Sequence, residues 1–145
     1  MNTVFELEAK ADHRGRLYPF DIQESLEFIP KRLFFITDVP AGTVRGHHAH
    51  LKTIQALICI SGVIDVHMCN GSEEHIHRLL PGYYIIENPM TWTSMYFVEG
   101  KSVLLVVSSE EHNDSDYIKN FEEYKAIMAA NNEKMPQNNR NASIT

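Results

Sequence analysis

Short apolar runs alternate with turn signals along most of the chain. From Phe5 to about Val107, segments rich in Val, Ile, Phe and Tyr are separated by Gly, Pro, Asn and Asp about every eight to twelve residues, a spacing typical of β-sandwiches and barrels. The Ser-Gly pair at 61–62 and the Asn-Gly-Ser triplet at 70–72 are predicted to form tight hairpin turns. We therefore expect an all-β protein. The clearest predicted strands are RLYPFDI, RLFFITDV, IQALICISG, VIDVHMC, EEHIHRLL, GYYIIEN, SMYFVEG and SVLLVVSS.

One helix is predicted after the strands, in SDYIKNFEEYKAIMAANN, with Ser115 as its N-cap. The polar remainder has no periodicity, so we expect a single domain over residues 1–130 and a disordered tail over residues 131–145. A chain of 145 residues is long enough to bury about two-thirds of its unfolded surface in one core. The apolar residues at helical spacing are Tyr117, Ile118, Phe121, Tyr124, Ile127 and Met128.

Charge and hydropathy narrow the range of partners. The net charge of -6 and a pI near 5.7 provide no basic face for a nucleic-acid backbone. No apolar run reaches the roughly 20 residues needed to span a bilayer, and the N-terminal segment lacks the order of a signal peptide. We therefore expect a soluble cytoplasmic protein without nucleic-acid or membrane partners. Cys59 and Cys69 lack CxxC spacing and are expected to be reduced, buried thiols.

The densest group of titratable side chains lies in GTVRGHHAHLKTIQALICISG, residues 42–62. Residues i and i+2 of a strand point to the same face, so His48 and His50 are expected to project together into a barrel, with Ala49 packed outside. His47 is expected to face away. Imidazoles with an ordinary pKa near 6.5 are suited to moving protons at neutral pH. His67 and His112 are expected to be structural, and His75 and His77, which lie among charged residues, are expected to be solvated.

The spacing of this segment resembles the first cupin motif, G-x5-H-x-H-x3/4-E-x6-G, except that Gln55 stands in place of the metal-binding glutamate. Glutamine is neutral and a weaker ligand than a carboxylate. The second cupin motif contributes a further histidine, but PGYYIIENPMTWTSMY contains none and has Thr93 near that position. Two good ligands make a poor transition-metal site. The sequence therefore favours a metal-free cupin that performs acid/base chemistry, and a metal-dependent cupin enzyme is an alternative.

Several segments together resemble the sugar-nucleotide 3,4-ketoisomerases, the dTDP-4-keto-6-deoxyglucose 3,4-ketoisomerase family of metal-independent cupins. They are DHRGRL, PKRLFFITDVPAGTVRGHHAH, Gln55 with its apolar strand, and NDSDYIKNFEEYK. The resemblance implies a cupin jelly-roll barrel with a short C-terminal helix and no cofactor. The implied reaction exchanges a keto group between carbons 3 and 4 of a dTDP-linked 6-deoxyhexose through an enediol, in deoxyamino-sugar and lipopolysaccharide biosynthesis. His50 would move the carbon-bound proton and His48 the protons on oxygen.

The resemblance also directs attention to substrate-binding candidates. Arg14, Arg32 and Arg45 lie in the family-like segments and could bind the diphosphate, and two of them precede a glycine that permits close backbone approach. Gln55 is expected to bind a sugar oxygen or to hold an imidazole tautomer. The aromatic candidates for contacts with the base or sugar are Trp92, Tyr83 and Tyr96. The alternative roles are surface ion pairs for the arginines and core packing for the aromatic residues. A homodimer that covers edge strands is also expected.

Two departures from the family pattern keep other functions open. Phe34 and Phe35 occupy a segment that often contains tyrosine, and Thr93 follows Trp92 where the family often has histidine. The loss of these polar groups favours altered substrate or stereochemistry, or reduced activity. A non-catalytic sugar-nucleotide-binding cupin is therefore a second hypothesis. An epimerase with the same barrel fits the RG-x-HAH pattern less well.

Overall fold

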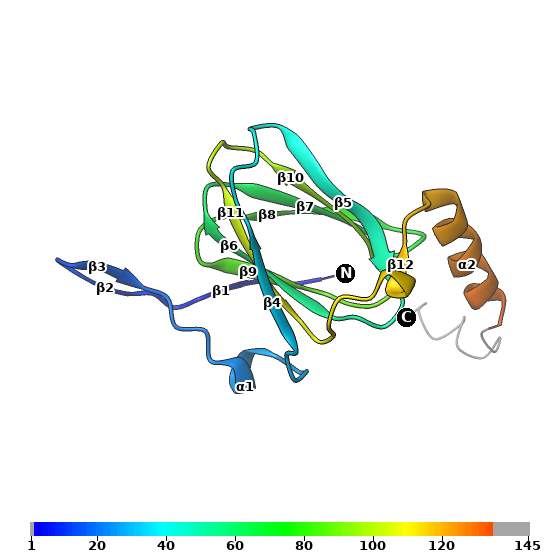
Figure 1. The fold of residues 1–145 in the computed structure, drawn as a ribbon, viewed down its shortest axis with the longest axis horizontal. Helices are drawn as coiled ribbons and strands as arrows, with labels where there is room; N and C mark the ends of the chain where they lie inside the picture. Colours follow the sequence, from blue (N-terminus) through cyan, green and yellow to red (C-terminus); the bar gives the residue numbers. More distant parts are fainter. Residues whose placement is uncertain (1, 135–145) are drawn as a thin grey trace, which may run out of the picture.

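Two five-stranded antiparallel sheets face each other in this computed structural model, which describes residues 2–134 (Figure 1). The all-β prediction is confirmed. In spatial order the first sheet contains β1 (Val4–Glu6), β9 (Tyr83–Glu87), β6 (Gln55–Ser61), β11 (Val103–Ser108) and β4 (Arg32–Ile36). The second sheet contains β12 (Tyr117–Ile118), β5 (Thr43–His50), β10 (Trp92–Phe97), β7 (Ile64–Cys69) and β8 (Glu74–Leu79).

The main core lies between the sheets and follows from alternation along the strands. In β10, for example, Thr93, Met95 and Phe97 are buried and the residues between them are half-buried. Cys59 and Cys69 are buried and unpaired, as predicted, and burial raises the pKa of the Cys59 thiol to about 12. The buried core residues are Val39, Leu57, Cys59, Ile64, Val66, Met68, Leu79, Ile85, Met95, Phe97, Leu104 and Val106.

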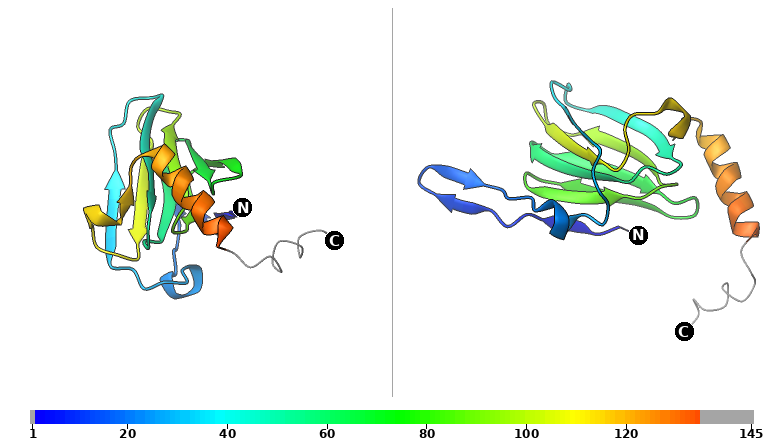
Figure 2. Two further views of the ribbon diagram at one scale, coloured as in Figure 1. Left: turned by 90° about the vertical axis from the view of Figure 1, so that its right-hand side faces the viewer. Right: turned by 60° about the horizontal axis from the view of Figure 1, so that its bottom comes forward.

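Helix α2 (Phe121–Glu133) lies across one end of the sheets (Figure 2). Its Tyr124 is fully buried, and the hydroxyl donates to the carbonyl of Cys69 at 2.8 Å and to that of Met90 at 2.9 Å. The predicted N-cap was wrong: Asn120 caps the helix, and its side chain accepts from the Glu123 N–H at 2.9 Å.

The segment before Asn120 is extended instead of helical. Tyr117 and Ile118 form β12 and pair with His50 and Ala49 of β5. For these two residues, pairing with the edge of the second sheet is therefore favoured over helix formation. Ser115 lies in the short 3₁₀ helix η1 (Asp114–Asp116). The single domain over residues 1–130 stays a prediction. Helix α2 includes the first residues of the predicted tail, and residues 135–145 lie outside the described residues.

One predicted hairpin is confirmed and one is wrong. Strands β7 and β8 pair with Cys69 opposite Glu74, so residues 70–73 form a four-residue loop. Only Gly71 has a positive φ in this loop, so the loop is not the two-residue type I′ turn that an Asn-Gly pair favours. Strands β6 and β7 belong to different sheets, so the turn at Gly62 crosses between sheets. A Cβ on Gly62 would lie 2.1 Å from Ser102 Oγ, which explains the glycine.

The N-terminal segment departs most from the predicted strands. RLYPFDI supplies only the end of β3 (Gly15–Leu17), and α1 (Ile22–Ser25) begins soon after Pro19, which lacks the N–H that continued pairing would use. Strands β2 (Lys10–Asp12) and β3 form a hairpin that projects away from the barrel (Figures 1 and 2).

The prediction that His75 and His77 are solvated was wrong. Their partners across the sheet are Met68 and Val66, whose side chains are buried between the sheets, so both imidazoles turn inward and are half-buried. Ile76 between them faces outward and is 65% exposed. Residues 2–134 contain no helix long and apolar enough to cross a membrane.

Candidate active site

A layer of polar side chains faces inward at one end of the barrel. Residues directly opposite in a sheet share a face. Thr93 is opposite His48, and Tyr117 is opposite His50, in the second sheet. In the first sheet Gln55 stands between Glu87 and Ser108. Apolar residues therefore fill the middle of the barrel, and this polar layer lies at one end.

A β-bulge at RGHHAH aligns the histidines. Ser94 pairs with Gly46 and Thr93 with His48, so His47 is the extra residue, with a φ of 59°. It is exposed, and its Nδ1 lies 2.9 Å from Ser94 Oγ, as expected for a side chain that faces away. Gly46 has a φ of 95°, and a Cβ there would lie 2.9 Å from the Thr93 carbonyl oxygen. The bulge therefore requires this glycine.

His48 and His50 converge in the layer, with ring centroids 5.1 Å apart. His50 is 2% exposed and lies between two carboxyl groups. Its Nδ1 is 3.4 Å from Asp116 Oδ2, and its Nε2 is 3.7 Å from Glu87 Oε1. Burial lowers the pKa of His50, and the Asp116 carboxylate acts in the opposite direction. The imidazole is therefore a neutral base at pH 7.

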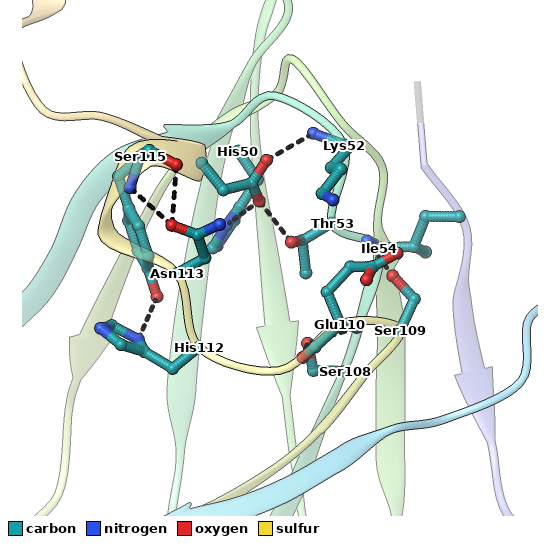
Figure 3. A network of polar contacts seen from close by, with 12 residues as sticks. His50, Lys52, Thr53, Ile54, Ser108, Ser109, Glu110, His112, Asn113 and Ser115 are labelled. Atoms are coloured by element: carbon teal, nitrogen blue, oxygen red, sulfur yellow. Dashed lines mark hydrogen bonds and ion pairs between the residues drawn. The ribbon is translucent and has the colours of Figure 1, made fainter.

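Asp116 is held as a carboxylate by hydrogen bonds from Lys52 and Thr53, two residues that Figure 3 shows beside His50. Burial alone would raise the pKa of Asp116, but hydrogen bonds from the Thr53 hydroxyl and the Lys52 N–H, together with His50, lower it overall. A carboxylate beside Nδ1 favours the tautomer with hydrogen on Nδ1 and a lone pair on Nε2. Asp116, and not Gln55, is therefore placed to hold the tautomer of His50.

His48 is half-buried, and its pKa is lowered to about 4 by burial and then by the neighbouring His50. The Tyr117 ring packs against both imidazoles, with centroids 4.9 Å from His48 and 4.5 Å from His50. Burial raises the pKa of Tyr117, and Arg32 opposes that shift. Two neutral imidazoles thus lie beside a neutral phenol.

Phe34 and Phe35 lack a hydroxyl, but Tyr117 brings a phenol ring against both histidines. Phe34 faces inward, and the Arg32 guanidinium carbon lies 4.6 Å from its ring centroid. Phe35 points outward and is 67% exposed, so a tyrosine there could not reach the histidines. Sequence reasoning missed Tyr117 because it stands at helical spacing with the residues that follow it.

The structure brings some of the predicted binding residues to the layer. Gln55 is buried in it, and Arg32 faces inward and opposes the rise in the pKa of Tyr117. Arg45 is exposed, and it pairs with Met95, whose side chain is buried between the sheets. The bulge therefore turns Arg45 to the same face of β5 as His48.

The other four predicted residues lie elsewhere. Arg14 is at the tip of the projecting hairpin, where it pairs with Asp12 and its side chain is 79% exposed. Trp92 faces outward and packs against α2, with its ring centroid 5.1 Å from that of Phe121. Tyr83 starts β9, at the end opposite Glu87, and Tyr96 faces outward near Gly42. Within one chain, these four side chains are not part of the histidine layer.

No group of three or more His, Cys, Asp and Glu side chains is arranged to hold a metal ion within residues 2–134. Thr93, at the predicted position of the missing histidine, is 1% exposed and points into the layer beside His48. The layer therefore presents two imidazoles, a phenol and two carboxyl groups, a set that can move protons between neighbouring atoms of a ligand.

Residues 1–129 match the family described as "WxcM-like, C-terminal", also named FdtA. The chain belongs to this family. Among its relatives is the TDP-4-oxo-6-deoxy-alpha-D-glucose-3,4-oxoisomerase of Aneurinibacillus thermoaerophilus, which is 28% identical over 129 residues, 88% of this chain and 93% of that protein. The predicted membership of the sugar-nucleotide 3,4-ketoisomerases is thereby confirmed.

Solved structures of sugar 3,4-ketoisomerases have the same fold. The sugar 3,4-ketoisomerase QdtA from Thermoanaerobacterium thermosaccharolyticum, in complex with TDP, matches with a TM-score of 0.83 and 30% identity, over 90% of this chain and 96% of QdtA. A histidine-to-asparagine variant of QdtA, in complex with TDP-4-keto-6-deoxyglucose, matches with a TM-score of 0.83 and 30% identity, over 89% of this chain and 94% of the variant. The predicted cupin barrel is confirmed.

Proposed function

We propose that this WxcM-like protein is a sugar-nucleotide 3,4-ketoisomerase that converts a dTDP-linked 4-keto-6-deoxyhexose to its 3-keto isomer. The observation that carries the proposal is the convergence of His48 and His50 beside Tyr117, in a fold shared with 3,4-ketoisomerases. The names of the relatives support the substrate, because QdtA structures contain TDP and TDP-4-keto-6-deoxyglucose.

The reaction requires a base and an acid at adjacent carbons. A base takes the proton from carbon 3, the electron pair forms a bond between carbons 3 and 4, and the oxygen on carbon 4 accepts a proton to give an enediol. The hydroxyl on carbon 3 then loses its proton while carbon 4 gains one. No electron leaves or enters the sugar, so the proton carriers are sufficient.

His50 is proposed as the carbon base and His48 as the group that moves protons on oxygen. Asp116 would stabilise the imidazolium that His50 becomes, because its carboxylate lies 3.4 Å from Nδ1. The phenol of Tyr117, which contacts both rings, is a second source of a proton for oxygen. Arg32 and Arg45 are proposed to bind the diphosphate, since both turn toward the histidine face.

Solvent exchange tests the proposed function. Incubation with dTDP-4-keto-6-deoxyglucose in deuterated buffer is expected to place deuterium at carbon 3 or 4, measured by NMR against a protein-free sample. If the protein binds several nucleotide-linked 4-keto sugars but places no deuterium on any of them, it is a non-catalytic sugar-nucleotide-binding cupin. Thr93, at a position where the family often has histidine, favours this second candidate.

We also propose a cytoplasmic homodimer that acts in deoxyamino-sugar and lipopolysaccharide biosynthesis. Two observations support the dimer. Every residue of the β2–β3 hairpin is exposed. Edge strand β4 presents Leu33 and Phe35 outward, 61% and 67% exposed. A second copy that covers this surface would remove apolar area and an open edge from water.

The dimer has its own test. Analytical ultracentrifugation is expected to give a dimer for the natural protein and a monomer for Phe35→Asp. The matched control is Ile76→Asp on edge strand β8, where a side chain of similar exposure, 65%, is replaced in the other sheet. A monomeric natural protein would contradict the proposal, and dissociation by Ile76→Asp alone would move the interface to β8.

A further inference from the structure

Glu87 is a buried carboxyl that the proposed reaction does not use. It ends β9, faces inward opposite Gln55 and is 2% exposed. In the part of the chain that the structure describes, Glu87 Oε1 has no hydrogen-bond partner, and the same holds for both ring nitrogens of His50, of which Nε2 lies 3.7 Å from Glu87 Oε1. Two unsatisfied polar atoms that face each other in a core are costly and are retained most often where they serve chemistry.

The charged state of Glu87 follows from its surroundings. Burial raises the pKa of Glu87 to about 8, and the Thr93 hydroxyl opposes that shift. Thr93 from β10 and Gln55 from β6 are neutral. The titratable or charged groups in the layer or beside it are His48, His50, Tyr117, Asp116, Arg32, Arg45, His112 and Lys119. Asp116 holds the negative charge on the far side of His50. Glu87 is therefore the uncharged member of the two carboxyl groups at neutral pH.

An uncharged Glu87 is compatible with the role of His50 as a base. If the proton moved from Glu87 to His50, the imidazole would already hold the proton that it must take from the sugar. The buried setting favours the neutral pair over this ion pair. Loss of the Glu87 proton to solvent would add a second carboxylate near Asp116, and this charge would oppose the negative charge that develops on the sugar oxygen.

We propose that Glu87 is a positioning residue for His50 and acts in its protonated, uncharged form. It keeps the imidazole between a carboxylate at Nδ1 and a neutral carboxylic acid at Nε2. Ionisation of Glu87 ends the isomerisation. This inference rests on the proposed ketoisomerase function, since it concerns the base of that reaction.

Two substitutions separate the roles of Glu87. Glu87→Gln mimics the protonated acid, because its amide is neutral and similar in shape. Glu87→Leu removes the polar group beside His50 Nε2. The natural enzyme is expected to lose kcat about tenfold per pH unit above the Glu87 pKa of about 8. Glu87→Gln should keep kcat within about threefold at pH 7 and extend the active range by at least about one pH unit. Glu87→Leu should lose at least about tenfold in kcat at pH 7 with KM unchanged.

Two kinetic results would contradict the proposed role of Glu87. An alkaline decline that is unchanged in Glu87→Gln, or a loss in Glu87→Gln as large as in Glu87→Leu, would overturn the proposal. A thermal melt of each variant shows whether it folds. Carbon-13 NMR of the glutamate carboxyl carbons provides a readout without turnover: one signal should titrate near pH 8 and disappear in Glu87→Gln. If that titration is present but no sugar exchanges deuterium, the proposed function fails while the protonated state of Glu87 stands.

Discussion

His50→Asn is expected to lower kcat about 10²- to 10⁴-fold, the range that a positioned general base contributes. Asparagine fills part of the imidazole volume but cannot accept and return a proton at neutral pH. Because the diphosphate contacts are proposed for arginines on β4 and β5, dTDP affinity should remain unchanged. The measurements are deuterium exchange into the sugar and calorimetric binding of dTDP.

His47→Asn is the matched control. It is the same substitution three positions earlier in the same strand, at an exposed side chain that bonds to Ser94 outside the barrel. Asparagine also tolerates the positive φ of 59° at this position better than most residues. Exchange by His47→Asn should match the natural protein. An unchanged rate in His50→Asn would remove His50 from the mechanism, and loss of dTDP binding would assign it to the ligand contacts.

Asp116→Asn is expected to lower kcat about 10²-fold while KM stays near its natural value. The asparagine oxygen can still accept from the Lys52 N–H at the Oδ1 position, and the amide nitrogen can donate to the Thr53 hydroxyl at the Oδ2 position, so the loop should stay in place. The negative charge that stabilises the His50 imidazolium disappears. Since Asp116 opposes the downward shift of the His50 pKa, that pKa should fall further, and the acid limb of the pH profile should move to lower pH.

Asp114→Asn tests whether any charge in this segment has the same effect. Asp114 lies two residues earlier in η1, its side chain is 82% exposed, and it pairs only with His112 among the ion pairs of the described residues. Its kinetics should equal those of the natural protein. Equal losses in Asp114→Asn and Asp116→Asn would mean that the loop is disturbed as a whole. An acid limb that does not move in Asp116→Asn would contradict coupling between Asp116 and His50.

Local pattern predicted most of the barrel. Strands β6, β7, β8, β9 and β11 fall within the apolar runs that suggested them, because alternation along a strand reports directly which side chains face the core. Pairing was not predictable in the same way. The Gly62 turn joins two sheets, which depends on the neighbours of β6 and not on the turn itself. Tyr117 and Ile118 have helical spacing, yet they pair with the edge of β5.

The same distinction between local pattern and long-range pairing applies to the candidate site. The spacing of His48 and His50 was sufficient to place both imidazoles on one face, because a period of two residues is a local property of the strand. The same spacing could not identify their partners. Asp116, Glu87 and Tyr117 reach His50 from three other elements, and only the register of β12 with β5 and the closure of the two sheets bring them within a few ångströms.

From sequence alone, the alternation of apolar runs determined an all-β fold, and the resemblance carried by the HAH motif with its flanking segments determined the family and with it the barrel. Both patterns are local properties of the sequence, so they can be recognised without knowledge of the fold. The tertiary structure decided which carboxyl group is charged. Asp116 receives hydrogen bonds from Thr53 and Lys52 and keeps its charge, while Glu87 is fully desolvated and keeps its proton. Burial and hydrogen bonding set these states, and both arise only when distant strands pack together.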